Sequence, residues 1–133
     1  MEQLPQGTVL VVEDSPPLRR VLSDLLRSQG FTRVVEAPSG RAAKQLLAGE
    51  RPDLVCVELT LPDISGYDVC EHIRATPGLE TLPVLVLSER TQPVDRAQAE
   101  EAGASGYLIK PFTAEEFQQQ VERVMAARPR KET

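Results

Sequence analysis

Polar side chains with reactive chemistry follow four short apolar runs of this sequence, each at the point where a run ends. They are Glu13, Asp14, Glu58, Ser88 and Lys110. If these runs lie side by side, three carboxylates, one hydroxyl and one ammonium converge on one place. Two carboxylates about 4 Å apart repel each other by roughly 4 kcal/mol at an effective dielectric constant near 20. Such a cluster therefore either binds a hard cation such as Mg²⁺ or forms a structural ion-pair cluster with the Lys110 ammonium.

The runs that position these residues alternate with stretches of helical periodicity along the chain. Strands are expected at 8–12, 32–36, 54–58, 83–87 and 106–109, of which the second is the weakest. Helices are expected between Ser15 and Gly30, at 39–48, 66–75 and 93–102, and from Thr113 onward. Five strand–helix units favour an α/β fold with an open, doubly wound parallel sheet that helices cover on both faces. Such sheets bind ligands beyond the carboxyl ends of their strands, which is where the polar residues lie.

Capping residues and apolar spacing mark the first and last helices most clearly. Ser15 can cap the first helix, and Gly30 ends it. The apolar stripe of this helix consists of Leu18, Val21, Leu22, Leu25 and Leu26. Thr113 opens the last helix, and Glu116 three residues later completes a capping box. The side chains of the last helix that are expected to face the core are Phe117, Val121, Val124 and Met125.

Composition limits the class of protein before any family is considered. The chain has 133 residues with 15 basic and 20 acidic side chains, a formal charge of −5 and a pI near 4.9. This length suits one domain, and the acidic balance disfavours a nucleic-acid groove, whose usual signature is a basic excess. No apolar run approaches the roughly 18 residues of a membrane span, and the first residues lack a secretory signal, so we expect a cytoplasmic protein. Cys56 and Cys70 match no metal or redox spacing and are expected to be reduced thiols in or near the core.

Four segments of the chain together carry a resemblance to one protein family. They read VLVVEDSP, PDLVCVELTLPDISGYDVC, LPVLVLSE and GASGYLIKPF, in the order and spacing of that family. The chain resembles a response-regulator receiver domain of two-component signalling, of the kind that regulates chemotaxis. The resemblance implies a flavodoxin-like sheet of five parallel strands in the order 2-1-3-4-5, with five helices. It also implies a single receiver-like domain over 1–133, with a core at about 7–127 and a polar tail at 128–133.

The resemblance assigns roles to the polar residues at the strand ends. Glu13 and Asp14 correspond to the acidic pair that holds Mg²⁺ in receivers. Glu58, at the phosphoacceptor position, and the backbone carbonyl of Thr60 complete the implied metal ligands. Ser88 corresponds to the hydroxyl that contacts the phosphoryl group.

Further implied roles fall in and after the last strand. Tyr107 corresponds to the aromatic switch residue, which swings inward when Ser88 is engaged, and ordinary cover for the neighbouring helix is the alternative. Lys110 corresponds to the lysine that bonds a phosphoryl oxygen. The bond between Lys110 and Pro111 is cis in this family, and we expect the same here.

Glu58 departs from the family, whose phosphoacceptor is an aspartate four residues before the proline of the following loop. Pro62 identifies that register, so the acceptor position holds a glutamate. The extra methylene moves the carboxylate by about 1.5 Å, and a misplacement near 1 Å can slow phosphoryl transfer by ~10²-fold. We therefore expect no ordinary phosphorylation. The chain is expected to be an atypical pseudo-receiver that acts by protein–protein interaction and not as an enzyme.

Two interpretations of Glu58 stay open, together with one alternative function. Glu58 either mimics the phosphorylated state and holds the output face permanently on, or pairs with Lys110 in a fixed docking module. The alternative function is a phosphorylation-competent receiver that accepts phosphate from a histidine kinase with Mg²⁺. Mg²⁺ binding is also open, because the acidic pair is retained while the longer Glu58 side chain fills pocket space.

Expected partners follow from the same resemblance. They are a histidine kinase or a downstream signalling protein. Partners or a homodimer would use the face formed by the helix at 93–102, the strand at 106–109 and the last helix. Nucleic acid and membrane are not expected partners of this domain. A phosphate-binding enzyme on the same sheet is disfavoured, because the loop EDSPP after the first strand would repel phosphate without a metal.

Overall fold

A single parallel sheet forms the centre of the computed structural model, which describes residues 7–128. Its strands are β1 (Thr8–Val12), β2 (Arg33–Ala37), β3 (Leu54–Glu58), β4 (Val84–Ser88) and β5 (Gly106–Ile109). They lie in the order β2-β1-β3-β4-β5, and every neighbouring pair is parallel. The expected flavodoxin-like topology is therefore confirmed.

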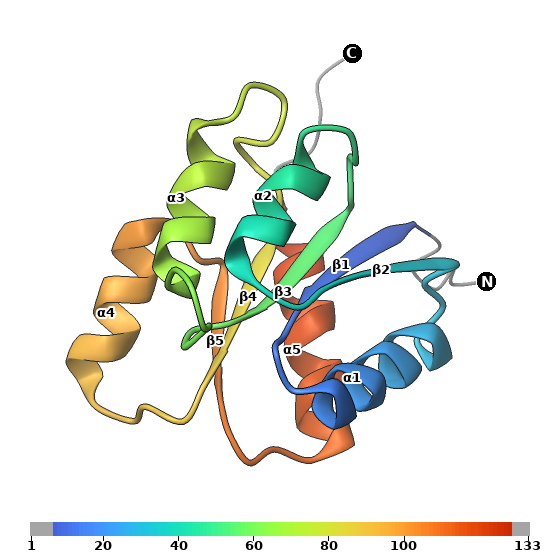
Figure 1. Ribbon diagram of the computed structural model, residues 1–133. Helices are drawn as coiled ribbons and strands as arrows, with labels where there is room; N and C mark the ends of the chain where they lie inside the picture. The colour runs from blue at the N-terminus through green and yellow to red at the C-terminus, as the bar shows by residue number, and fades with distance from the viewer. Residues whose placement is uncertain (1–6, 129–133) are drawn as a thin grey trace.

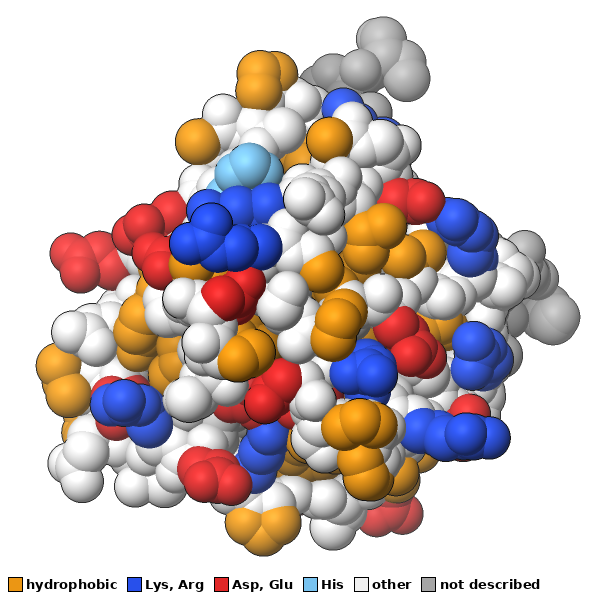
Figure 2. Space-filling model, in the orientation of Figure 1, with side chains coloured by type: hydrophobic (Ala, Val, Ile, Leu, Met, Phe, Trp, Pro, Cys, Tyr) orange, Lys and Arg blue, Asp and Glu red, His pale blue; other side chains and the backbone are white. Residues whose placement is uncertain are grey.

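Helices cover both faces of the sheet. They are α1 (Pro16–Ser28), α2 (Gly40–Leu47), α3 (Gly66–Ala75), α4 (Pro93–Ala102) and α5 (Ala114–Ala126). Helices α1 and α5 pack on one face, and α2, α3 and α4 pack on the other (Figure 1). Figure 2 shows acidic and basic side chains intermixed on the surface that the view presents. Within residues 7–128, no helix has the length and apolar character needed to cross a membrane.

The inner strands β1, β3 and β4 are largely apolar because both of their faces are covered. All five residues of β3 and all five of β4 are buried. Alternate residues point to opposite faces, so Cys56 packs toward α1 and α5 while Val55 and Val57 pack toward α2, α3 and α4. Cys56 and Cys70 are free and buried, as expected, and burial raises the pKa of the Cys70 thiol to about 12.

The capping signals of the sequence act as expected. The Ser15 hydroxyl accepts from the N–H of Leu18, and Gly30 follows α1 with a φ of 110°. Thr113 and Glu116 form the capping box of α5, with N···O distances of 2.9 and 3.0 Å. In this last helix Phe117, Val121 and Val124 are buried, and Met125 is half-buried against the same core.

Some sequence-based expectations differ from the structure in detail. Strands β2 and β4 lie one residue later than predicted, and β4 begins after Pro83 because proline has no N–H to donate to a strand partner. Helix α2 is shorter by one residue at each end, since Ser39 and Ala48 are its caps. Val21 was expected to face the core, but it is 51% exposed, whereas Leu22 and Leu26 of the same helix are fully buried. Residues 129–133 of the predicted polar tail lie outside the described residues.

Candidate functional site

The carboxyl ends of β1, β3, β4 and β5 bring four of the predicted polar side chains to one place. Val12 pairs with Val57 in the β1–β3 register, so the residues that follow them, Glu13 and Glu58, lie side by side at the ends of adjacent strands. Glu13 is 2% exposed, Glu58 5% and Ser88 1%. The cluster is therefore a buried polar site at the strand ends and not a solvated rim.

Lys110 supplies the positive charge of this site. Its ammonium contacts Glu58 Oε1 directly and lies 3.5 Å from Glu13 Oε1. Burial lowers the pKa of Lys110, but the hydrogen bond to Glu58 and the two neighbouring carboxylates outweigh burial and raise it. The lysine is therefore charged and lies between two acidic side chains.

The remaining carboxylate oxygens of the site differ in their partners. Glu58 Oε2 accepts from the backbone N–H of Thr60 at 3.0 Å, so both Glu58 oxygens are engaged. Glu13 Oε2 accepts from the N–H of Ser15 at 3.1 Å, whereas Glu13 Oε1 has no hydrogen-bond partner among the described residues. Burial raises the pKa of Glu13, and the Ser15 N–H and the Lys110 charge offset only part of that effect.

Ser88 and Tyr107 meet at one residue of the loop between β4 and α4. Ser88 Oγ accepts from the N–H of Arg90 at 2.9 Å, and the Tyr107 hydroxyl donates to the Arg90 carbonyl, also at 2.9 Å. Tyr107 is only 5% exposed, so its ring is turned inward. The expected cis bond between Lys110 and Pro111 is present.

A family model described as "Response regulator receiver domain" matches residues 9–122 of the chain. This chain belongs to the response-regulator receiver family. The order of the strands, the acidic residues at their ends and the lysine before a cis-proline are all in agreement with that assignment.

Curated relatives of this receiver domain differ in total length. The chain is 33% identical over 116 residues to the chemotaxis protein CheY of Pseudomonas aeruginosa PAO1, covering 87% of this chain and 94% of that protein. It is 43% identical over 109 residues to the transcriptional regulatory protein KdpE of Mycobacterium tuberculosis H37Rv, covering 82% of this chain but 46% of that protein. The chain thus spans nearly all of one relative and about half of the other.

Solved structures with the same fold include receivers from several proteins. A putative response regulator from Chloroflexus aurantiacus J-10-fl is 34% identical, with a TM-score of 0.85 and coverage of 92% of this chain and 99% of that chain. The receiver domain of sensor histidine kinase PA1611 from P. aeruginosa PAO1 is 30% identical, with a TM-score of 0.82 and coverage of 92% and 100%. That receiver has a magnesium ion coordinated in its active-site cleft.

The structure places the residues that were predicted to hold a metal near one another, but with unequal burial. Glu13 and Glu58 are buried, whereas Asp14 and Thr60 are exposed residues in contact with them, Asp14 through its side chain to Glu13 and Thr60 through its N–H to Glu58. Within residues 7–128, no group of three or more His, Cys, Asp or Glu side chains is arranged to hold a metal ion. Because the Lys110 ammonium already lies between the two buried carboxylates, the side chains as they stand do not fit Mg²⁺.

Two features of the receiver site were not predicted from the sequence. The backbone of Arg90 holds both Ser88 and Tyr107, and no side-chain pattern reveals a backbone contact of this kind. Asp63, in the loop after β3, accepts N–H groups of Gly40, Arg41 and Ile64 at 2.8–3.0 Å and so ties that loop to the start of α2. Desolvation opposes the effect, but these three N–H groups and the N–H of Asp63 itself lower the pKa of Asp63 to about 2.

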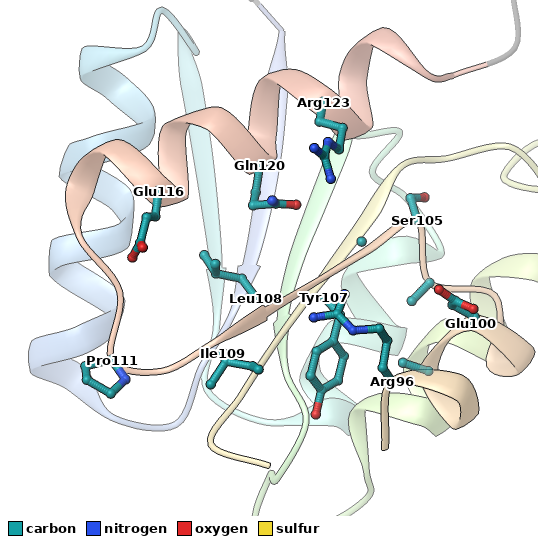
Figure 3. A pocket seen from close by; sticks show the side chains of 13 residues that line it. Arg96, Glu100, Ser105, Tyr107, Leu108, Ile109, Pro111, Glu116, Gln120 and Arg123 are labelled. Atoms are coloured by element: carbon teal, nitrogen blue, oxygen red, sulfur yellow. The ribbon is translucent and has the colours of Figure 1, made fainter. Parts of the chain in front are cut away.

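A pocket of about 570 Å³ lies on the α4–β5–α5 face of the domain. Figure 3 shows β5 crossing its floor, with Arg96 and Glu100 projecting from α4 and with Glu116, Gln120 and Arg123 projecting from α5. The Arg96 guanidinium lies 5.2 Å from the centre of the Tyr107 ring. The inward ring of Tyr107 is therefore part of the wall of this pocket.

Gly66 sets the distance between α3 and the end of β3. A Cβ atom at Gly66 would lie 2.7 Å from the Glu58 carbonyl oxygen and 2.9 Å from Leu59 Cα. We expect Gly66→Ala to lower the free energy of unfolding by about 1–3 kcal/mol, because backbone atoms must move to admit the methyl group. Urea denaturation measures this loss. Gly49→Ala is the matched control, since nothing lies within 4 Å of the added Cβ, and an equal loss in both variants would contradict the prediction.

Proposed function

We propose that this receiver domain transmits signals by binding other proteins in one fixed conformation, independently of phosphorylation. The observation that carries the proposal is the direct contact between the Glu58 carboxylate and the Lys110 ammonium inside a buried site. In this proposal the domain is an atypical, non-enzymatic receiver of two-component signalling.

Phosphoryl transfer to Glu58 is opposed by the contacts that it already makes. Lys110 engages one carboxylate oxygen, and the Thr60 N–H engages the other. The lysine that receives a phosphoryl oxygen in the family is therefore already paired with a carboxylate. Phosphoryl transfer depends on positioning an unhindered oxygen in line with the phosphorus atom, so an incoming phosphoryl group would have to displace existing contacts.

The surroundings of Ser88 favour a fixed docking module over mimicry of the phosphorylated state. The Ser88 hydroxyl bonds to the Arg90 N–H and makes no hydrogen bond to Glu58. If Glu58 mimicked the phosphorylated state, we would expect the Ser88 hydroxyl to turn toward the Glu58 carboxylate instead. The pairing of Glu58 with Lys110 supports the fixed module, whereas the inward Tyr107 ring is the position that the resemblance implies for the switch residue when Ser88 is engaged.

We propose the α4–β5–α5 face as the docking surface of this module. Its partners would be a histidine kinase, a downstream signalling protein or a second copy of the domain. Charged residues of both signs flank the pocket on this face, which suits a polar protein interface. The proposed site of action is the cytoplasm, and no step of the proposal uses Mg²⁺, nucleic acid or membrane.

Incubation of the natural protein with acetyl phosphate and Mg²⁺, followed by intact-mass spectrometry, tests the proposal. We expect no stoichiometric phosphate adduct, because Glu58 is misplaced by about one bond and is already paired. Stoichiometric phosphate on Glu58 that is stable in acid but labile in base would overturn the proposal. It would establish a phosphorylation-competent receiver instead.

A further inference from the structure

Helix α4 has few apolar side chains that hold it to the rest of the domain. Only Asp95, Ala99 and Ala102 of this helix are buried, and Val94 is 58% exposed. Alanine methyl groups bury little surface, and each buried CH₂-sized group contributes only about 0.8 kcal/mol. Polar contacts must therefore provide much of the free energy that holds α4 in its position.

One polar contact lies at the start of α4. The hydroxyl of Tyr67, which is on α3, donates to the backbone carbonyl of Asp95 at 3.2 Å and lies 3.3 Å from Gln98 Oε1. The Tyr67 ring also packs against the apolar layer beneath these helices. The first turns of α4 are thus tied to α3 through one hydroxyl.

A second polar contact lies at the end of α4. Arg74, also on α3, donates from Nε to the Gly103 carbonyl at 3.0 Å and from Nη1 to the Leu82 carbonyl at 2.7 Å. The last turn of α4 has no basic residue of its own and contains Glu100 and Glu101, which have the wrong sign for the helix dipole. The Arg74 guanidinium supplies the missing positive charge.

Gly103 allows Arg74 to come this close. A Cβ atom at Gly103 would lie 2.5 Å from Arg74 Cγ, and the φ of +112° at this position also favours glycine. The Arg74 contact is therefore part of how α4 ends and is not an incidental surface hydrogen bond.

Tyr67 and Arg74 are seven residues apart, which places them on one face of α3 two turns apart. Figure 1 shows that this helix lies beside α4. We propose that Tyr67 and Arg74 are positioning residues that clamp the two ends of α4 and thereby set the α4–β5–α5 face from α3. The inference rests on the proposed function in one respect, which is that this face is the docking surface. The clamp itself involves neither Glu58 nor Lys110.

Hydrogen–deuterium exchange of backbone amides tests the clamp in the full chain. Removal of one hydrogen bond in Tyr67→Phe should raise exchange in α4 by about fivefold, and Arg74→Met should raise it by roughly tenfold. The double variant should show a larger increase than either. The matched control is Arg51→Met, because Arg51 donates to the Leu47 and Glu50 carbonyls at the end of α2. This control should leave exchange in α4 unchanged.

The ratio of exchange in α4 to exchange in β1 and β3 separates positioning from general stability. A rise confined to α4 and its flanking loops supports the clamp. An equal rise in the central strands, or unchanged α4 exchange in the double variant, would overturn it. Tyr67→Phe keeps the packed ring and should fold even if Arg74→Met does not. The measurement uses no phosphate, so its failure would leave the proposed function standing, and phosphorylation of Glu58 would not by itself refute the clamp.

Discussion

Glu58→Asp is expected to accept phosphate from acetyl phosphate and Mg²⁺ at a rate at least ~10²-fold above that of the natural protein. The shorter side chain withdraws the carboxylate from Lys110 by about the length of one C–C bond. It leaves the ammonium free to meet a phosphoryl oxygen, and it leaves room for a metal ion beside Glu13. The other side chains that the family places around an acceptor are already present, because Ser88 and Lys110 lie at the ends of β4 and β5.

A time course of intact mass, followed by peptide mapping of the adduct, measures this gain. Glu58→Gln is the matched control, because it keeps the length of the glutamate and removes the nucleophilic charge. It should show no adduct. Phosphate on another residue in both variants would mean that position 58 is not the acceptor.

Failure of Glu58→Asp to gain phosphate would contradict the prediction in an informative way. The exposed Asp14 would then be the first residue to examine, since it lies at the rim of the site and not between the buried carboxylates. The methylene of Glu58 would in that case be only one of several differences from a competent receiver.

Lys110→Met is expected to cost roughly 3 kcal/mol of stability at pH 7, because it leaves buried carboxylates without their cation. Glu13 is 2% exposed and Glu58 5%, so water cannot replace the lost ammonium without opening the site. The free energy of unfolding from urea titration measures the loss. Lys44→Met is the matched control, since Lys44 lies on α2, far in sequence from the strand ends, and takes no part in the ion pairs found among residues 7–128.

The loss in Lys110→Met should shrink as the pH falls from 7 toward 5. Burial already raises the pKa of Glu13 in the folded protein, and Lys110 is one of the groups that lowers it. Without Lys110 the folded-state pKa moves further above the unfolded value. A buried carboxyl group with a raised folded-state pKa lowers the free energy of unfolding when it is ionised at high pH. This loss disappears as the group binds a proton at lower pH. A pH-independent deficit would show that Lys110 acts through packing and not through charge.

A second substitution distinguishes charge pairing from simple loss of a side chain. Lys110→Met combined with Glu58→Gln should recover part of the stability, because removing both charges leaves less uncompensated charge than removing one. An additive loss in the double variant would contradict a direct interaction between the two groups.

Much of the fold could be predicted from local patterns. The bounds of β3, β5, α3 and α4 agree with the predicted ranges, because apolar runs, glycines and prolines mark their ends. The predictions that were wrong concern residues whose contacts are not determined by a local sequence pattern. Val21 belongs to an apolar stripe that is wider than the area of α1 in contact with the sheet, so the residue faces solvent.

The sequence by itself determined the family, the edge of the sheet where the polar residues gather and the identity of the residue at the acceptor position. Those features depend on spacing along the chain, since strand ends in a parallel sheet meet at one edge. Only the tertiary structure decided that Lys110 contacts Glu58, that Tyr107 is turned inward onto Arg90 and that α3 holds both ends of α4. These contacts join residues that lie 17 to 52 positions apart for the site and 28 to 29 apart for the clamp. They depend on where side chains point between packed elements, which no short-range periodicity of the sequence predicts.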